Sequence, residues 1–116
     1  MRPDEDFRQD ETAPRVLTVG DVAADQAADI APREVIHADF ADVSAAALER
    51  WAPDIVISPL VGEGFDCLDL ANLLTEAGFA GRYLGAAGSL PKPAVVRREV
   101  RACYPDLDFD ILGAAP

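Results

Sequence analysis

The chain has 116 residues, half of them hydrophobic, which predicts one folded domain with a modest core. Ten Lys and Arg residues stand against 21 Asp and Glu residues, giving a formal net charge of −11. This charge argues against nucleic acid and against an anionic membrane surface as partners, because both are bound through clustered Lys and Arg.

Residues 1–14 are rich in charged groups and predict a disordered acidic tail ahead of a domain over residues 15–116. An acidic arm that docks on a partner is the alternative interpretation. The charged amino terminus does not resemble a signal peptide, and no apolar run is long enough to span a bilayer. Cys67 and Cys103 lie outside any CxxC or Cys/His motif, so we expect free thiols, no zinc site and a cytoplasmic location.

Five β-rich runs follow the tail. Most of their side chains are apolar, without the polar alternation of a half-exposed strand, and this pattern is typical of parallel strands covered on both faces. The expected strands lie at residues 15–20, 34–40, 54–60, 82–87 and 108–113.

Four stretches with helical character separate these strands, at residues 21–32, 42–53, 65–81 and 93–105. Asp42 or Ser44 is expected to cap the second helix. Gly78 is expected to end the third helix, and Pro93 lies near the start of the fourth. The alternation of strands and helices predicts an α/β fold with a parallel sheet and right-handed crossovers.

The segment over residues 37–74 carries three motifs of one known family. Ala47-Leu48-Glu49 matches a helix signature, residues 53–57 (PDIVI) match a strand, and residues 64–70 (GFDCLDL) match a loop and helix start. In these motifs the chain resembles the receiver domain of response regulators, and the similarity extends roughly over residues 15–90. The resemblance implies a flavodoxin-like doubly wound sheet of five parallel strands in the order 2-1-3-4-5.

Residues that perform phosphoryl transfer in receivers are replaced here. Receivers hold an aspartate phosphoacceptor where this chain has Pro59, and proline cannot act as a nucleophile. Their acidic, Mg²⁺-binding pair aligns with Gly20 and Asp21, and their Thr or Ser at the fourth strand aligns with Ala86 or Ala87. Their lysine before the fifth helix has no clear counterpart. The resemblance thus implies a degenerate phosphoacceptor pocket of Gly20, Asp21, Pro59 and Ala86, with no catalytic residue, metal or cofactor.

Other polar residues near this pocket have competing interpretations. A divalent ion held by Asp21 with Glu63 or Asp66 is one, but a carboxylate that caps the first helix is preferred. Asp66 is expected to cap the third helix. His37 has no Ser, Cys or second His near it in the sequence, so catalysis is not expected there. Cys67 opens the third helix among carboxylates, which favours a buried or unreactive thiol.

A receiver would continue into a fifth helix after the strand at residues 108–113. That helix normally shares a sheet face with the first helix, so we expect apolar surface on residues 54–58 and 108–112 to face water. Exposed apolar patches of this kind are unusual on a monomer. We therefore expect a homodimer, with a partner protein or the amino-terminal tail as the alternative cover.

Arg97, Arg98 and Arg101 form a basic cluster on the expected fourth helix. In receivers the surface of the fourth helix and fifth strand commonly docks partners, so the resemblance makes these three residues the candidate partner-binding surface. A solvated helix face, with arginine near the helix C-terminus, is the alternative interpretation.

The resemblance and its departures favour a non-phosphorylatable receiver-like module of two-component signalling. Such a module would act through protein–protein interaction and not as an enzyme. The alternative is a small-ligand sensor or an enzyme that uses a pocket around Gly20, Pro59, Val61 and Ala86, where open α/β sheets bind ligands.

Overall fold

The computed structural model of the chain describes residues 13–22, 24–28, 30–88 and 92–112. Apart from its last two positions, the predicted tail over residues 1–14 lies outside the described residues. Within the described ranges, no helix combines the length and hydrophobicity that crossing a membrane requires.

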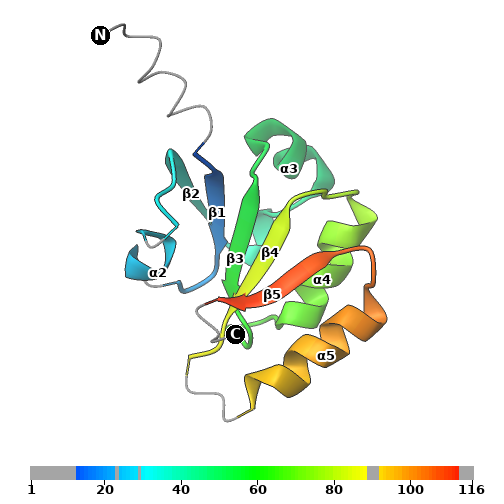
Figure 1. Cartoon of the computed structure of the whole chain (residues 1–116). Helices are drawn as coiled ribbons and strands as arrows, with labels where there is room; N and C mark the ends of the chain where they lie inside the picture. Colours follow the sequence, from blue (N-terminus) through cyan, green and yellow to red (C-terminus); the bar gives the residue numbers. More distant parts are fainter. Residues whose placement is uncertain (1–12, 23, 29, 89–91, 113–116) are drawn as a thin grey trace, which may run out of the picture.

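Five parallel strands form the centre of the molecule (Figure 1): β1 (Arg15–Val19), β2 (Glu34–Ala38), β3 (Ile55–Pro59), β4 (Arg82–Ala86) and β5 (Asp108–Leu112). Their order in the sheet is β2-β1-β3-β4-β5. The predicted strands and the predicted strand order are therefore confirmed, and the topology is that of flavodoxin-like α/β folds.

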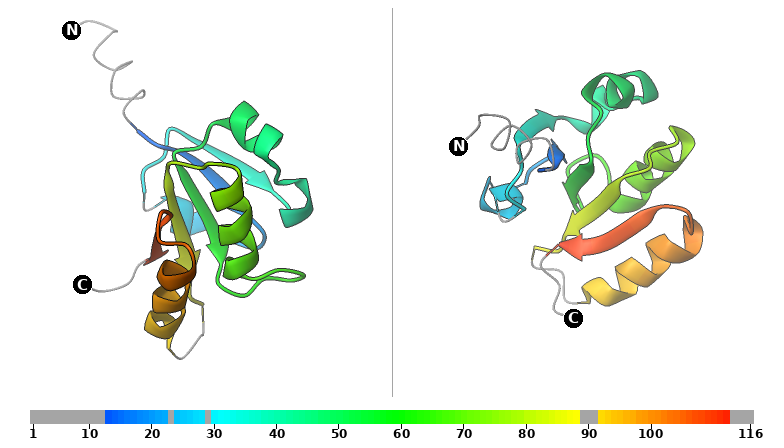
Figure 2. Two further views of the ribbon diagram at one scale, coloured as in Figure 1. Left: turned by 90° about the vertical axis from the view of Figure 1, so that its right-hand side faces the viewer. Right: turned by 45° about the horizontal axis from the view of Figure 1, so that its top comes forward.

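Helical segments connect the strands: α2 (Ala24–Ala28), the short 3₁₀ helix η1 (Phe40–Asp42), α3 (Ala45–Trp51), α4 (Cys67–Glu76) and α5 (Pro93–Cys103). Residues of α3, α4 and α5 pack on one face of the sheet, whereas α2 packs on the other (Figures 1 and 2). We call the first the major face and the second the minor face.

Local hydrogen bonds explain where the helices begin and end. The Ser44 side chain accepts a hydrogen bond from the Ala47 N–H, so Ser44 is the cap of α3 and Asp42 belongs to η1. Asp66 caps α4 in a reciprocal capping box with Asp69, which confirms the prediction for Asp66. Gly78 follows α4 with a φ of 75°, a conformation that favours glycine.

The main core lies between the major face and its three helices. Leu17, Val56, Tyr83 and Phe109 are register partners on four adjacent strands, so their side chains form one row across this face. The helices contribute the buried residues Leu48, Leu70, Leu74 and Val100. Burial of this row holds β1, β3, β4 and β5 in register, because a slip by one residue would turn every side chain to the other face.

The minor face has a smaller core, in which Val16, Ile57 and Leu84 pack with Ala27 of α2. The expectation of apolar strand surface in water on this side is wrong for β3 and β5. Ile57 is fully buried. Strand alternation in β5 turns Phe109 and Ile111 to the major face and leaves Asp108, Asp110 and Leu112 on the minor face, where Leu112 is partly buried against the small core. The exposed large hydrophobic residues of the described chain are instead Val35, Val61 and Val95.

Candidate functional site

The predicted pocket residues meet at the carboxyl ends of the central strands. Pro59 and Ala86 are register partners at the ends of β3 and β4. Gly20 follows β1 and is so close to Pro59 that a Cβ built on Gly20 would lie 3.5 Å from the proline Cδ. Asp21 follows Gly20 and is exposed. The structure therefore brings the ends of β1, β3 and β4 together, as the resemblance implies, but supplies proline and alanine side chains there.

Phe65 fills much of the space above these strand ends. Its side chain comes from the loop between β3 and α4, and the residue is only 7% exposed. A Cβ on Gly20 would lie 3.0 Å from the ring, and one on Gly62 would lie 2.7 Å from it. Glycine at both positions thus makes room for the ring. The role of Phe65 was not predicted from the sequence. Its packing on Gly20 depends on a contact between residues far apart in the chain, which residue spacing does not reveal.

The ring of Phe40 stacks on that of Phe65. Their centroids are 4.7 Å apart and their planes differ by 5°. Phe40 belongs to η1, directly after β2, so the stacked pair joins the β2–α3 connection to the β3–α4 loop. Aromatic pairs of this kind contribute about 0.5–1.5 kcal/mol beyond the area they bury. The stacked rings therefore hold these two connections against each other.

Backbone hydrogen bonds also hold the β3–α4 loop in place. The Gly62 N–H donates to the Phe65 carbonyl at 2.9 Å, and the Cys67 N–H donates to the Leu60 carbonyl at 2.9 Å. Val61 and Asp66 form an isolated antiparallel bridge across the same loop. The loop is therefore a closed turn that presents its tip, with Glu63 and the exposed Val61, to solvent.

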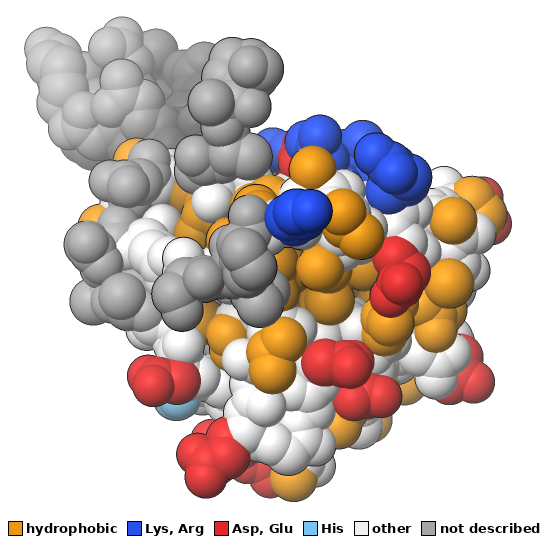
Figure 3. Space-filling view, turned by 90° about the horizontal axis from the view of Figure 1, so that it is seen from below, with side chains coloured by type: hydrophobic (Ala, Val, Ile, Leu, Met, Phe, Trp, Pro, Cys, Tyr) orange, Lys and Arg blue, Asp and Glu red, His pale blue; other side chains and the backbone are white. Residues whose placement is uncertain are grey.

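A cavity of about 410 Å³ opens beside the aromatic pair. It is lined by Gly20, Asp39, Phe40, Ala41, Glu63, Gly64 and Phe65. Figure 3 looks onto this end of the sheet, and in that view Lys and Arg gather along one border while Asp and Glu are spread over the remainder. The cavity lining holds two carboxylates and no cationic side chain.

The carboxylates of this region do not assemble into a metal centre. Asp66 accepts a hydrogen bond from the Asp69 N–H at 3.0 Å, so its side chain serves the helix cap. In the described part of the chain, no group of three or more His, Cys, Asp or Glu side chains is placed to hold an ion. Capping of α2 by Asp21 stays a prediction, because the residue directly before Ala24 lies outside the described ranges.

A buried polar contact lies beneath the strand ends. The hydroxyls of Ser58 and Tyr83 share a hydrogen bond of 2.5 Å, and the Ser58 hydroxyl also donates to the Pro59 carbonyl. Burial raises the pKa of Tyr83 well above its ordinary value, so the phenol is neutral. Ser58 is fully buried. These hydroxyls therefore satisfy each other and are not exposed to a substrate.

Cys67 is buried as predicted, at the first position of α4. Burial, followed by the negative charge of Asp66, raises the pKa of its thiol to about 11. The thiolate is the nucleophilic form of cysteine, so this side chain is unreactive near neutral pH.

His37 lies on the minor face near the edge of the sheet and is exposed. Its Nδ1 is 2.8 Å from the hydroxyl of Thr18. Thr18 is almost fully buried, and its hydroxyl also lies 3.5 Å from the Ile36 carbonyl. The contact therefore anchors β2 to β1 and does not aim a nucleophile at the cavity.

The predicted arginine cluster divides into two parts in the structure. Arg97 and Arg101 both pair with Asp110 of β5, at 3.2 and 3.4 Å, and Arg101 donates a further hydrogen bond to the Phe109 carbonyl at 3.0 Å. Within the described residues, Arg98 has no ion-pair partner and is exposed. Asp110 is the residue that sequence reasoning missed in this cluster.

Asp110 is held in its ionised form by three contacts. The Ile111 N–H donates to its carboxylate at 2.7 Å, and this bond is the largest cause that lowers the pKa of Asp110, followed by Arg97 and Arg101. Arg101 donates to the Phe109 carbonyl and the Ile111 N–H donates to Asp110, so two backbone groups of β5, an edge strand of the sheet, are occupied. Side chains that occupy an edge in this way oppose pairing with a further strand.

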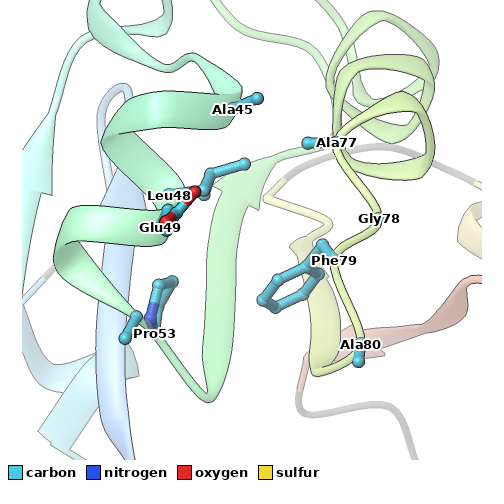
Figure 4. Close-up of a pocket in the computed structure, with 9 residues that line it drawn as sticks. Ala45, Leu48, Glu49, Pro53, Ala77, Gly78, Phe79 and Ala80 are labelled. Carbon is cyan, nitrogen blue, oxygen red and sulfur yellow. The ribbon is translucent and has the colours of Figure 1, made fainter.

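A second cavity lies at the opposite, amino-terminal end of the sheet, between the C-terminal ends of α3 and α4 (Figure 4). Its volume is about 330 Å³, and Glu49 contributes the one carboxylate of its lining. Leu48 points across it toward Ala77, and the Phe79 ring points across it toward Pro53 (Figure 4). This cavity therefore resembles the first in size but carries half as many acidic groups and no stacked ring pair.

A scan of the sequence against protein-family models gives no match, and a search of curated proteins gives no significant match. The flavodoxin-like fold therefore rests on strand order and parallel register.

Proposed function

We propose that this chain is a receiver-like signalling module of two-component type that cannot be phosphorylated and acts by binding proteins in the cytoplasm. The observation that carries the proposal is the Phe65 ring above the strand ends. It packs against Gly20, at a place where the resemblance expects acidic groups around a phosphoacceptor. The strand end itself carries Pro59.

The chemistry of phosphoryl transfer supports this proposal. An aspartyl phosphate needs a carboxylate nucleophile, and Mg²⁺ needs several oxygen ligands. Pro59 and Ala86 supply no oxygen from their side chains, and Ser58 is turned into the core toward Tyr83. For the same reason we propose no enzyme activity, since Pro59 and Ala86 bring no ionisable side chain to the ends of β3 and β4.

A protein-binding surface on α5 is the second part of the proposal. Arg98 is exposed and has no ion-pair partner among the described residues, whereas the guanidinium groups of Arg97 and Arg101 pair with Asp110. An acidic patch of a partner would meet one uncommitted guanidinium beside two that are already positioned. Electrostatic complementarity of this kind sets specificity and association rate.

Formation of a homodimer is the third part of the proposal. Val35 lies on β2 at the edge of the minor face and is 49% exposed. Pairing of two such faces would remove this side chain from water. Light scattering coupled to size-exclusion chromatography is expected to show a dimer that Val35→Glu converts to a monomer, and a wild-type monomer at high micromolar concentration would exclude this part.

Incubation with a small phosphodonor and Mg²⁺ tests the central part of the proposal. Intact-protein mass spectrometry is expected to show no covalent phosphoryl group, with an ordinary receiver domain as the positive control. A phosphoryl group on Asp21, Glu63 or Asp66 would show that the site is active. A pull-down of partner proteins tests the α5 surface. Arg98→Glu is expected to abolish retention of the partner, whereas the control Arg33→Glu, which changes a distant exposed arginine, should leave it retained.

The cavity beside Phe40 and Phe65 favours one alternative function, a small-ligand sensor. Under this alternative the bound molecule would be a free metabolite, and saturable changes in the amide spectra of Gly20 and Gly64 would appear with a low-molecular-weight fraction of a cell extract. Under the preferred function those amides respond to protein partners.

A further inference from the structure

The cavity at the carboxyl end of the sheet has an unusual combination of charge and surface. Asp39 and Glu63 line it from opposite loops, and neither has an ion-pair partner among the described residues. Phe40 and Phe65 form an aromatic wall. Val61, 66% exposed, adds an apolar group on the same turn as Glu63.

The carboxylates and the aromatic rings together favour a planar cation. Unpaired carboxylates attract positive charge, and aromatic rings attract cations through the negative potential of their faces. A guanidinium group is planar, stacks on rings and donates hydrogen bonds to carboxylates in pairs. A guanidinium is less strongly hydrated than an ammonium group, so its desolvation on entering a cavity costs less free energy.

We propose that this cavity receives an arginine side chain of a protein partner, with Asp39 and Glu63 as hydrogen-bond acceptors and Phe40 as a stacking surface. The inference rests on the proposed protein-binding function and names the chemistry of one contact. A free anion is disfavoured because the lining carries two carboxylates and no cation. A hard divalent ion is disfavoured because its oxygen ligands are too few among the described residues.

The arginine comes from a different chain in this proposal. Arg97 and Arg101 pair with Asp110 of β5, and Arg98 lies on the same helix, α5. β5 and β2 form opposite edges of the sheet, and Asp39 directly follows β2. The acidic balance of the whole chain, −11, also favours a basic partner over a second copy at this place.

Titration with N-acetylarginine amide, followed by NMR spectra of the backbone amides, tests the proposal. Saturable shifts are expected at Gly20 and Gly64, with a dissociation constant on the order of millimolar. N-acetylcitrulline amide, a neutral analogue of nearly the same shape, is expected to cause none. Asp39→Asn and Glu63→Gln should each weaken binding about two- to fivefold, as exposed charge pairs do.

Glu49→Gln is the matched control, because Glu49 lines the second cavity of similar size (Figure 4). It should leave the arginine titration unchanged. Equal weakening by Glu49→Gln would show that the overall charge of the chain, and not the cavity, attracts the probe. Phe40→Leu tests the stacking contact and should weaken binding while the spectrum keeps its native dispersion.

Besides equal weakening by Glu49→Gln, two results would overturn the inference: no saturable shift at Gly20 and Gly64, or equal shifts from the citrulline analogue. If either result occurs and no phosphoryl transfer is detected, the proposed function is retained and only the arginine contact is rejected. Covalent phosphoryl transfer to the chain would instead contradict the proposed function itself. The two failures are therefore distinguishable.

Discussion

The two faces of the sheet differ in how they are covered. On the major face, three helices bury a row of large side chains across four strands, including Tyr83 and Phe109. On the minor face, α2 has five residues, and the core there is a small group around Ile57 and Leu84. The difference shows where packing contributes most to stability, because the major face is filled with packed side chains whereas the rim of the minor face leaves Val35 and His37 exposed.

The largest expected effect comes from a cavity in the major core. Leu74 of α4 is fully buried, so Leu74→Ala should lower the free energy of unfolding by about 2–5 kcal/mol. Under conditions in which the chain is monomeric, Val35→Ala on the minor face should change it by about 0.5 kcal/mol or less, because the side chain is half exposed. Urea denaturation measures both variants, and equal losses would remove the distinction between the faces.

A somewhat smaller effect is expected at the aromatic pair. Gly62→Ala would place a Cβ 2.7 Å from the Phe65 ring and force the ring or the loop to move. Overpacking of this kind costs about 1–3 kcal/mol. Thermal unfolding gives the loss, and a change in the Phe40 and Phe65 ring signals by NMR shows that the pair has moved. Unchanged stability and unchanged ring signals would mean that Phe65 does not occupy the strand ends.

The buried hydroxyl contact should contribute less. Tyr83→Phe removes the hydrogen bond to Ser58 but leaves Ser58 its contact with the Pro59 carbonyl, so we expect a loss of about 0.5–1.5 kcal/mol. Tyr104→Phe serves as the control on a less buried tyrosine and should have a smaller effect. A larger loss in the control would show that the measurement reports tyrosine packing in general.

A still smaller effect than at the hydroxyl contact is expected at Asp110, on the edge of the minor face. Asp110→Asn removes two ion pairs and should cost at most about 1 kcal/mol at neutral pH, because the groups are partly solvated. The folded state lowers the pKa of Asp110, so its stabilisation is present above the ordinary aspartate pKa and is lost as pH falls through the folded value. Wild type and variant should therefore converge in acid, and a constant gap across pH would contradict this account.

Sequence patterns predicted most of the fold because the relevant signals are local. Apolar runs gave five strands, while Ser44, Asp66 and Gly78 marked helix boundaries through hydrogen bonds or backbone angles within a few residues. The strand order needed the resemblance, since local patterns do not specify which strands are neighbours.

What could not be predicted depends on contacts between distant residues. The stack of Phe40 on Phe65 joins two loops that are 25 residues apart, as the residue numbers 65 − 40 show. The role of Asp110 was hidden because its partners, Arg97 and Arg101, lie on another element. The apolar run of β5 did not reveal which face each side chain takes, and the structure places Phe109 and Ile111 on the major face and Leu112 on the minor face.

The most direct test of the account is a titration with Mg²⁺ and beryllofluoride, a phosphate analogue, followed by the backbone amide signals of Gly20 and Ala86. If Phe65 and Pro59 have removed the phosphoryl chemistry of this edge, neither signal should shift in a saturable way. Saturable shifts of both amides that require Mg²⁺ and the analogue together would contradict the account.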